Sequence, residues 1–402
     1  MKEVLKKILP TEKERNKANQ IIEKCITILE KRIKEKGITA NVTLQGSMAK
    51  DTWISGDKNI DIFIIFPHEY SKQQLKKYGL ELGVLSEYEI AYAEHPYVRN
   101  FLDGYEIDVV PAYQFKEGIR SSVDRTPLHT EYVKTHLKDN NQVRLLKKFT
   151  RSIGVYGSDL KVQGFAGYLC ELLIITYDTF LNVLKAAALW RPKEVIILEE
   201  PPEKEFSEPF VVIDPVDKNR NVAAVVSLEN FTRFVHHARK FLKDKDASYF
   251  FREPRSYTKM EGTVLYCIDF DTDIIDDMLF PQLRKTRDYM VNTLQKHGFR
   301  VGNTAVYNSG IAVELSVFEL PLHKKHMGPP IGEKEHCETF VEKYKSVFIE
   351  KDKLYTIINR KYTTAEHLLK EMLKEKTGFG KDLADVETTL QKVSKIDAVI
   401  YD

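Results

Sequence analysis

Residues 59–66, Asn59-Ile60-Asp61-Ile62-Phe63-Ile64-Ile65-Phe66, are the most informative run of this chain. The run predicts a β-strand, and because side chains alternate along a strand, Asn59 and Asp61 share one face. A second segment, Glu106-Ile107-Asp108-Val109-Val110-Pro111, again sets an acidic residue among apolar ones. Acidic side chains in apolar strands need a physical reason. The two strands predict an acidic platform in which Asn59 is an amide where a third carboxylate is expected.

A turn at Gly46-Ser47 precedes the first strand. Glycine permits a tight turn, and a hydroxyl with backbone amides at a helix start offers a place for phosphates. Alone, such a turn is more often a helix cap, and a single strand aspartate is more often exposed to solvent. Together, the turn, Asp61 and Asp108 indicate metal-dependent nucleotidyl transfer, because Mg²⁺ is bound by carboxylates and substrate phosphates.

Length and composition describe an ordinary globular protein. A chain of 402 residues is too long for one core and predicts two to four domains. With a net charge of only +2, any polyanion must be held by local patches. The cysteines are widely spaced without a C-x-x-C pair, which favours a reducing cytoplasm over a zinc or redox motif. No secretion signal is expected, and charged residues break the apolar stretch 168–190, so we expect no membrane span.

Periodicity along the chain predicts an α+β, multidomain protein. Residues 11–36 have helical spacing, and Thr11 and Glu14 are placed to form a capping box at the start of that helix. Further elements complete a mixed domain that ends near residue 140. We expect strands at 40–44, 59–66, 87–94, 97–101 and 105–110, and a helix at 71–82.

A second, helical domain is expected from residue 141 to about 250. Its first helix carries four basic residues on one face, here called the basic stripe: Arg144, Lys147, Lys148 and Arg151. The stripe faces a partner or is simply solvated. A long apolar helix is expected at about 160–187. From residue 255 onward, strands and helices mix in one or two α+β modules.

Longer segments carry a family resemblance. The motifs around Gly46-Ser47, Asp61 and Asp108 resemble the catalytic signature of DNA polymerase β-like nucleotidyltransferases. Other segments narrow the resemblance to the archaeal, class I CCA-adding enzymes, or tRNA nucleotidyltransferases, and extend it over nearly the whole chain. They are residues 123–129, 155–157, 164–173, 214–224, 324–330 and 360–362.

The resemblance implies an architecture, an activity and partners. A polymerase β-like catalytic head would occupy residues 1–140, a helical neck or nucleotide-binding domain 141–254, and an α+β body and tail 255–402. The tail would bind the acceptor and T arms of tRNA. The protein would add C, C and A to the tRNA 3′ end from CTP and ATP, without a template and with Mg²⁺, in the cytoplasm. A homodimer stays open as its oligomeric state.

The resemblance also implies roles for individual residues. Asp61, Asp108 and Asn59 would form the catalytic metal site, with Asp108 nearest the primer 3′ hydroxyl. The nucleotide-binding residues would be Ser47, Lys50, Lys147 and Tyr156 at the triphosphate, Thr126 and His129 at phosphate or sugar, and His95 and Arg220 at the base. The residues themselves leave other readings open, such as Arg220 capping the turn at 217–220. In the tail, the most suggestive cluster for RNA is Tyr307 with His323, Lys324, Lys325 and His326; a solvated loop is the alternative.

Asn59 departs from the family pattern, in which this position is ordinarily Glu or Asp. An amide oxygen can meet a metal but brings no charge, so metal binding should weaken. Asp57 is poorly placed to substitute, whereas Glu106 shares a strand face with Asp108 and is a candidate to compensate. The change is deliberate and inactivating, natural with a weakened metal site, or the mark of a tRNA-binding homologue without catalysis. A poly(A) polymerase-like activity is a further alternative.

Overall fold

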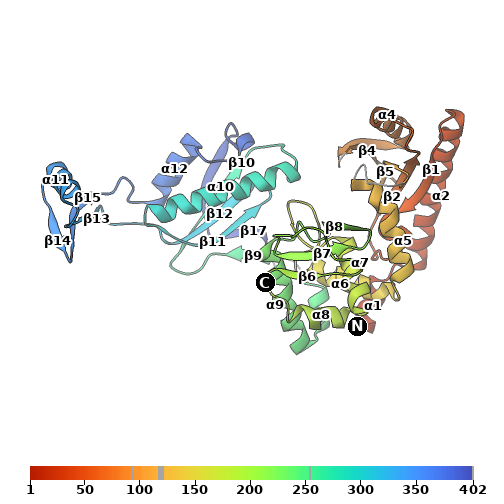
Figure 1. The fold of residues 1–402 in the computed structure, drawn as a ribbon, viewed down its shortest axis with the longest axis horizontal. Helices are drawn as coiled ribbons and strands as arrows, with labels where there is room; N and C mark the ends of the chain where they lie inside the picture. The colour runs from red at the N-terminus through yellow and green to blue at the C-terminus, as the bar shows by residue number, and fades with distance from the viewer. Residues whose placement is uncertain (93–94, 116–121, 253–254, 401–402) are drawn as a thin grey trace. The chain divides into compact units, whose positions relative to one another are not determined.

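The computed structural model describes residues 1–92, 95–115, 122–252 and 255–400. Its chain divides into two compact units, residues 1–253 and 254–401, which are described separately. Figure 1 shows the first unit in red to green and the second in teal to blue. Both units mix helices and strands, so the predicted α+β class is confirmed.

A mixed five-stranded sheet forms the N-terminal half of the first unit. The adjacent strands β2 and β5 are parallel, and all other neighbouring strands are antiparallel. Alternate residues of β2, including Ile60, Ile62 and Ile64, pack against helices α2 and α4. The sheet order is β1 (Asn41–Gln45), β2 (Asn59–Phe66), β5 (Tyr105–Tyr113), β4 (Pro96–Leu102) and β3 (Glu87–Tyr92).

Two helices cover that apolar face, α2 (Glu12–Glu35) and α4 (Lys72–Gly83). The predicted capping box of α2 is confirmed: the Glu14 amide donates to Thr11 Oγ1 at 3.2 Å and the Thr11 amide donates to Glu14 Oε2 at 2.7 Å. Helix α5 (Thr126–His136) contacts β1 and the short α3 (Gly46–Ala49). The acidic face of β2 and β5 is therefore the face that α2 and α4 leave uncovered.

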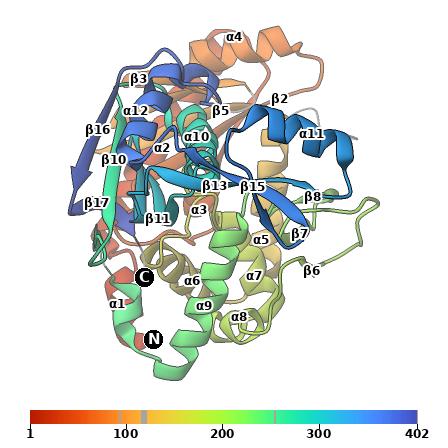
Figure 2. The same cartoon turned by 90° about the vertical axis from the view of Figure 1, so that its left-hand side faces the viewer.

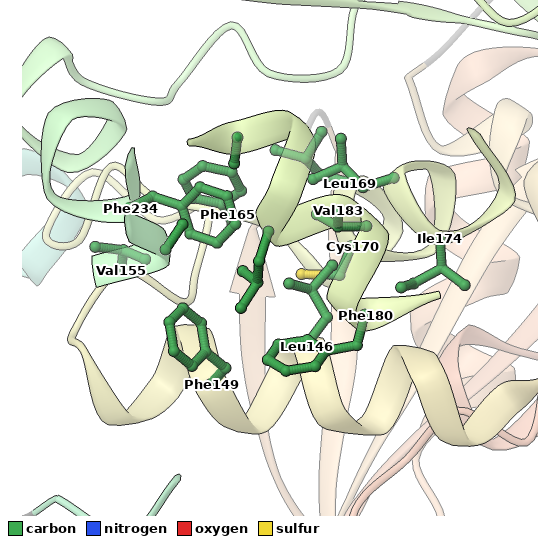
Figure 3. Close-up of a cluster of buried hydrophobic side chains, with 14 of the residues drawn as sticks. Leu146, Phe149, Val155, Phe165, Leu169, Cys170, Ile174, Phe180, Val183 and Phe234 are labelled. Atoms are coloured by element: carbon green, nitrogen blue, oxygen red, sulfur yellow. The ribbon is translucent and has the colours of Figure 1, made fainter. Parts of the chain in front are cut away.

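The rest of the first unit is mainly helical. Leu146 and Phe149 of α6 point into a core that includes Cys170 and Phe180 (Figure 3), with the Phe149 and Phe180 ring centroids 5.6 Å apart. Helices α8 and α9 lie side by side (Figure 2). The elements are α1 (Lys2–Ile8), α6 (Asn140–Ser152), α7 (Gly167–Tyr177), α8 (Phe180–Ala187) and α9 (Leu228–Asp244), with a small sheet of β6 (Glu194–Ile196), β7 (Phe210–Asp214) and β8 (Asp217–Asn221).

The expectation of one long helix at 160–187 is wrong. Asp178 takes a φ of 64°, which ends α7, and the Thr179 side chain caps α8 by accepting from the Asn182 amide. The two helices are bent by 91° at this break, and within the described ranges no single helix is long and apolar enough to cross a membrane. The apolar stretch forms buried helices of the core instead.

The second unit is built on a four-stranded sheet packed against two helices. Leu283 and Met290 of α10 and Leu369 of α12 pack into its hydrophobic core. A three-stranded sheet with α11 and a strand pair, β9 with β17, complete the unit. The first sheet is β11 (Arg300–Tyr307), β12 (Gly310–Val317), β10 (Val264–Phe270) and β16 (Thr388–Val393); the others are β13 (His323–Pro330), β15 (Lys353–Asn359), β14 (Phe348–Glu350), β9 (Arg255–Thr258) and β17 (Lys395–Ile400), with α10 (Asp276–Lys296), α11 (Lys334–Lys343) and α12 (Ala365–Glu375).

Candidate active site

The two predicted metal-site aspartates lie on neighbouring strands. The parallel register of β2 and β5 pairs Asp61 with Asp108 and Asn59 with Glu106. Because paired residues of adjacent strands point to the same side of a sheet, these four side chains stand together on the face away from α2 and α4. The structure thus brings Asn59, Asp61 and Asp108 together.

Gly46 lies against the carboxylate of Asp61. A Cβ added to Gly46 would fall 1.8 Å from Asp61 Oδ2, and the residue has a φ of +68°, so only glycine is accommodated. In the described part of the chain, no hydrogen bond or ion pair engages the Asp61 carboxylate. Burial, with the charge of Asp108 beside it, raises the pKa of Asp61 to about 6. A cation would relieve that unfavourable environment.

The donor set fits a hard cation that takes part of its ligands from the substrate. Within the described ranges, no group of three or more His, Cys, Asp or Glu side chains could hold a metal ion by itself. Asp61 and Asp108 are two carboxylates, and Asn59 adds an amide oxygen. Mg²⁺ commonly takes only one or two protein carboxylates and completes its shell with water and substrate phosphates. The residues present therefore fit Mg²⁺ with a bound nucleotide.

Arg99 forms a forked ion pair with Asp108. Its Nε donates to Oδ1 at 2.8 Å and one terminal nitrogen donates to Oδ2 at 3.0 Å. The pairing continues across the sheet, because Arg99 also lies 3.7 Å from Glu89 on β3. Each Asp108 oxygen keeps a second lone pair for another partner. Arg99 thus fixes the orientation of Asp108 and supplies a positive charge beside the acidic face.

Glu106 contacts the unusual amide. Asn59 Nδ2 donates to Glu106 Oε2 at 3.0 Å, which leaves the amide oxygen of Asn59 as its available acceptor. Glu106 also brings a negative charge next to the position where Asn59 lacks one. Asp57 is occupied elsewhere: it pairs with Arg151 at 2.6 Å and accepts from the Ile54 amide. Of the two candidates to compensate for Asn59, the structure places Glu106 in contact with it.

The two lysines predicted at the triphosphate, Lys50 and Lys147, share a buried carboxylate. Glu171 of α7 is 2.5 Å from Lys50 Nζ and 3.4 Å from Lys147 Nζ. Thr52 joins them, since its hydroxyl donates to Glu171 at 2.5 Å and accepts from Lys147 at 2.9 Å. Although burial acts against ionisation, the two lysines hold the pKa of Glu171 below its ordinary value. The loop after α3 is thereby fastened to α6 and α7.

The basic stripe is largely buried against that loop. Arg144 donates to the Trp53 carbonyl at 2.8 Å and pairs with Asp51 at 2.6 Å, and its side chain is only 2% exposed. Arg151 pairs with Asp57 and lies over the Tyr156 ring, 4.6 Å from its centroid. Of the two readings left open by the sequence, the solvated face is wrong. Arg144, Lys147 and Arg151 of the stripe face the segment 51–57 together with Glu171, whereas Lys148 lies over the Phe251 ring, 5.3 Å from its centroid.

Tyr156 and Ser47 lie beside these groups. A Cβ added to Gly167 would lie 3.2 Å from the Tyr156 hydroxyl and 3.5 Å from Lys147 Nζ, so this glycine, Tyr156 and Lys147 meet at the start of α7. Burial raises the pKa of Tyr156 to about 12, so its hydroxyl stays a neutral donor near neutral pH. Ser47 is in α3, and its carbonyl accepts from the Thr52 amide at 2.9 Å.

A second buried carboxylate, Asp214 at the end of β7, gathers several other predicted residues. It accepts from His129 Nε2 at 2.9 Å, from Arg220 at 2.7 Å and from the Tyr168 hydroxyl at 3.1 Å. Burial lowers the pKa of His129, against the opposing influence of Asp214. Arg220 belongs to β8 and pairs with Asp214, so its alternative role as a cap of the turn at 217–220 is wrong. Thr126 begins α5, one turn before His129.

Tyr168 connects the two carboxylate clusters. The His129 ring stacks on the Tyr168 ring with centroids 4.0 Å apart, and Lys50 Nζ lies 5.6 Å from the same ring. Lys50 and Lys147 also act on the pKa of Asp61, which places the lysines near the acidic face. Through Tyr168, the group around Asp214 and Arg220 therefore lies beside the group around Glu171 and Lys50. His95 is held at the sheet, where its Nε2 lies 2.6 Å from the Pro111 carbonyl.

Comparison with known proteins assigns the chain to a family. A nucleotidyltransferase domain model matches residues 22–129, the second domain of tRNA nucleotidyltransferase matches 141–251, and the C-terminal domain of CCA-adding enzymes matches 261–395. The CCA-adding enzyme of Methanosarcina barkeri is 40% identical over 399 residues, covering 92% of this chain and 88% of that protein. The chain belongs to the CCA-adding enzymes. The member of this family from Methanocaldococcus jannaschii is 38% identical, covering 93% of this chain and 90% of that protein.

The chain also has low similarity to solved structures. One is the Cid1 poly(U) polymerase, with a TM-score of 0.49 and 14% identity over 62% of this chain and 96% of that chain. A likeness of this size says nothing about activity. The resemblance to the archaeal CCA-adding enzymes is confirmed by the curated relatives, whereas the division of the first unit at residue 140 and the individual site roles stay predictions.

Three residues that hold the predicted site residues in place, Glu171, Asp214 and Arg99, were not predicted from the sequence. Glu171 is a lone acid within the apolar run of α7, a signal that was available, since a buried acid requires a partner. Asp214 likewise ends the apolar strand β7. The role of Arg99 depends on the pairing of β4 with β5, which no local pattern gives.

The tail cluster is not brought together. Tyr307 lies in β11 of the four-stranded sheet and donates to Asp269 at 2.8 Å, whereas His323–His326 belong to β13 of the other sheet. His326 packs against Phe340, with ring centroids 5.9 Å apart, and Lys325 pairs with Glu350. The expectation of one local cluster is therefore wrong for Tyr307, and the RNA contacts of the tail stay a prediction.

Proposed function

We propose that this protein adds C, C and A to the 3′ end of tRNA, taking the nucleotides from CTP and ATP without a nucleic-acid template. The family membership supports this reaction, and the pairing of Asp61 with Asp108 on adjacent parallel strands is the observation in the structure that carries it. Nucleotidyl transfer needs carboxylates beside a place for a triphosphate. The Asp61–Asp108 pair lies next to Gly46 and near Lys50.

Asp61 and Asp108, with the amide oxygen of Asn59, would hold Mg²⁺. The ion would neutralise charge on the attacking hydroxyl and on the leaving pyrophosphate. Asp108 is proposed to lie nearest the primer 3′ hydroxyl, and Arg99 holds it in a fixed orientation. Glu106 orients the Asn59 amide through the 3.0 Å hydrogen bond and adds the charge that the amide lacks.

The remaining residues would bind the nucleotide. Lys50 and Lys147 offer charge to the triphosphate, with Ser47 and Tyr156 beside them. His129 and Thr126 would contact phosphate or sugar. His95 and Arg220 would read the base, since a guanidinium can donate to the acceptors that cytosine and adenine share.

Several finer features belong to the same proposal. The acceptor and T arms of tRNA would lie on the body and tail, residues 255–402. Mg²⁺ is the proposed cofactor. A homodimer and a cytoplasmic location are consistent with the proposal and stay predictions.

Primer choice tests the proposal. The protein is incubated with CTP, ATP and Mg²⁺, and with tRNA lacking CCA, tRNA ending in CC, or an unstructured oligoribonucleotide. We expect three additions to the first primer, one to the second and none to the third. Comparable extension of all three would instead favour a poly(A) polymerase-like enzyme. Tight tRNA binding without incorporation, even by Asn59→Asp, would favour a binding protein that has lost catalysis.

A further inference from the structure

The phosphate end of the proposed site rests on one buried acid. Glu171 is 1% exposed, and its partners Lys50 and Lys147 are 8% and 2% exposed. Burying an ammonium is costly unless a counter-charge and hydrogen bonds accompany it. The structure supplies both at this point, because Glu171 pairs with the two lysines and Thr52 bonds to Lys147 and Glu171.

The lysines come from different parts of the fold. Lys50 follows α3 on the loop beside the acidic sheet, whereas Lys147 is in the middle of α6. Nothing in the local sequence holds their ammonium groups together, and like charges repel. Glu171 lies between them, with Oε2 toward Lys50 and Oε1 toward Lys147 and the Thr52 hydroxyl.

The donors of the two lysines are used differently. Lys147 Nζ has three partners, the Thr52 carbonyl at 3.2 Å, the Thr52 hydroxyl at 2.9 Å and Glu171 at 3.4 Å. Among the described residues, Lys50 Nζ has one hydrogen-bond partner, Glu171. An ammonium has three donors, so Lys50 keeps two for a ligand. Its aim is set by the Glu171 bond and by the Tyr168 ring beneath it.

We propose that Glu171 is a positioning residue for nucleotide binding, which holds the ammonium groups of Lys50 and Lys147 beside each other so that Lys50 presents its free donors to the triphosphate. This inference rests on the proposed function. If Glu171 were only a nearby negative charge, its removal would tighten binding of a triphosphate, because the site would become more positive. If Glu171 positions the lysines, its removal should instead weaken binding of the triphosphate.

The test is equilibrium binding of ATP and of CTP to the full chain without tRNA, monitored by calorimetry well below the thermal midpoint of each variant. We expect Glu171→Gln to weaken binding of both nucleotides by at least about tenfold, as for residues that orient a ligand-binding group. Glu171→Asp keeps the charge but shortens the side chain, and we expect a smaller loss of about threefold or more. If Glu171→Gln fails to fold, the binding measured for Glu171→Asp tests the proposal in its place.

A double-mutant cycle separates positioning from a general loss of structure. If Glu171 acts through Lys50, Glu171→Gln should have little further effect on binding in a Lys50→Met background. The matched control is Glu314→Gln, which changes another buried glutamate, bonded to Thr263, Tyr257 and the Met260 amide, in the second unit. The control should bind both nucleotides as the unchanged chain does.

The outcomes distinguish this inference from the proposed function. If the unchanged chain binds neither ATP nor CTP, the proposed function fails. If it binds both, and Glu171→Gln binds them equally well or more tightly, the positioning role is overturned. An undiminished effect of Glu171→Gln in the Lys50→Met background would overturn it as well.

Discussion

Asn59→Asp perturbs the acidic face at the point where this chain departs from its family. The substitution replaces the Nδ2 donor, now 3.0 Å from Glu106 Oε2, by a second carboxylate. Two unit charges about 4 Å apart repel by about 1 kcal/mol in bulk water, and both side chains are exposed, so this low value applies. We expect the unfolding free energy to fall by about 1 kcal/mol in the absence of divalent cations.

A bound divalent cation should more than offset the repulsion between the new carboxylate and Glu106. By the same rule, a doubly charged ion about 4 Å from the new carboxylate gains about 2 kcal/mol, which corresponds to roughly 30-fold in affinity. The assay measures incorporation of C into tRNA lacking CCA over a range of Mg²⁺ concentrations. We expect Asn59→Asp to reach half of its maximal rate at a lower Mg²⁺ concentration and to raise incorporation at limiting Mg²⁺.

Glu106→Gln is the matched variant. It removes the compensating charge, so half-saturation should move to higher Mg²⁺ concentration. The double variant Asn59→Asp/Glu106→Gln swaps the carboxylate and the amide between the two positions. It should restore the unfolding free energy lost by Asn59→Asp alone. If the unchanged chain and Asn59→Asp have the same rates at every Mg²⁺ concentration, the reasoning that Asn59 weakens the site is refuted.

Three further predictions follow from the geometry. Gly46→Ala should abolish incorporation, because the new Cβ would fall 1.8 Å from Asp61 Oδ2; rates within about twofold of the unchanged chain would contradict the close approach. Asp214→Asn should cost about 2 kcal/mol of unfolding free energy and reduce discrimination of CTP and ATP from UTP, measured by competition, because Arg220 loses its buried partner; equal discrimination would show that this anchor does not set the base-reading group. The stability gap between the unchanged chain and Glu14→Gln should be complete above pH 4.5 and shrink as the pH falls toward 2. Burial acts to raise the pKa of Glu14, but hydrogen bonds from Thr11, the Gly56 amide and Ser55 lower it to about 2; a gap that does not change between pH 7 and 3 in denaturant unfolding would contradict this.

Local patterns predicted the elements that depend on neighbouring residues. The strand at Asn59–Phe66 follows from its apolar composition, and the capping box at Thr11 follows from a spacing of three residues. The break at Asp178 was missed because an apolar run predicts burial but does not say where a helix turns.

The acidic pair could be proposed from sequence, but its supporting groups could not. Asp61 and Asp108 stand out because each is an acid in an apolar strand. The contact of Glu106 with Asn59 depends on the parallel register of β2 and β5, which are adjacent in the sheet but separated in sequence by α4, β3 and β4. The burial of Lys147 depends on α7 bringing Glu171 against α6, a long-range contact that helical periodicity does not encode.

The 3′-end sequence of tRNA after reaction shows directly whether the protein adds CCA. The unchanged chain is incubated with tRNA lacking CCA, all four nucleoside triphosphates and Mg²⁺, and the products are sequenced. We expect the unchanged chain to add C, C and A and then stop, and Asp108→Asn to add nothing. Products extended by runs of A or U, or equal addition by Asp108→Asn, would contradict it.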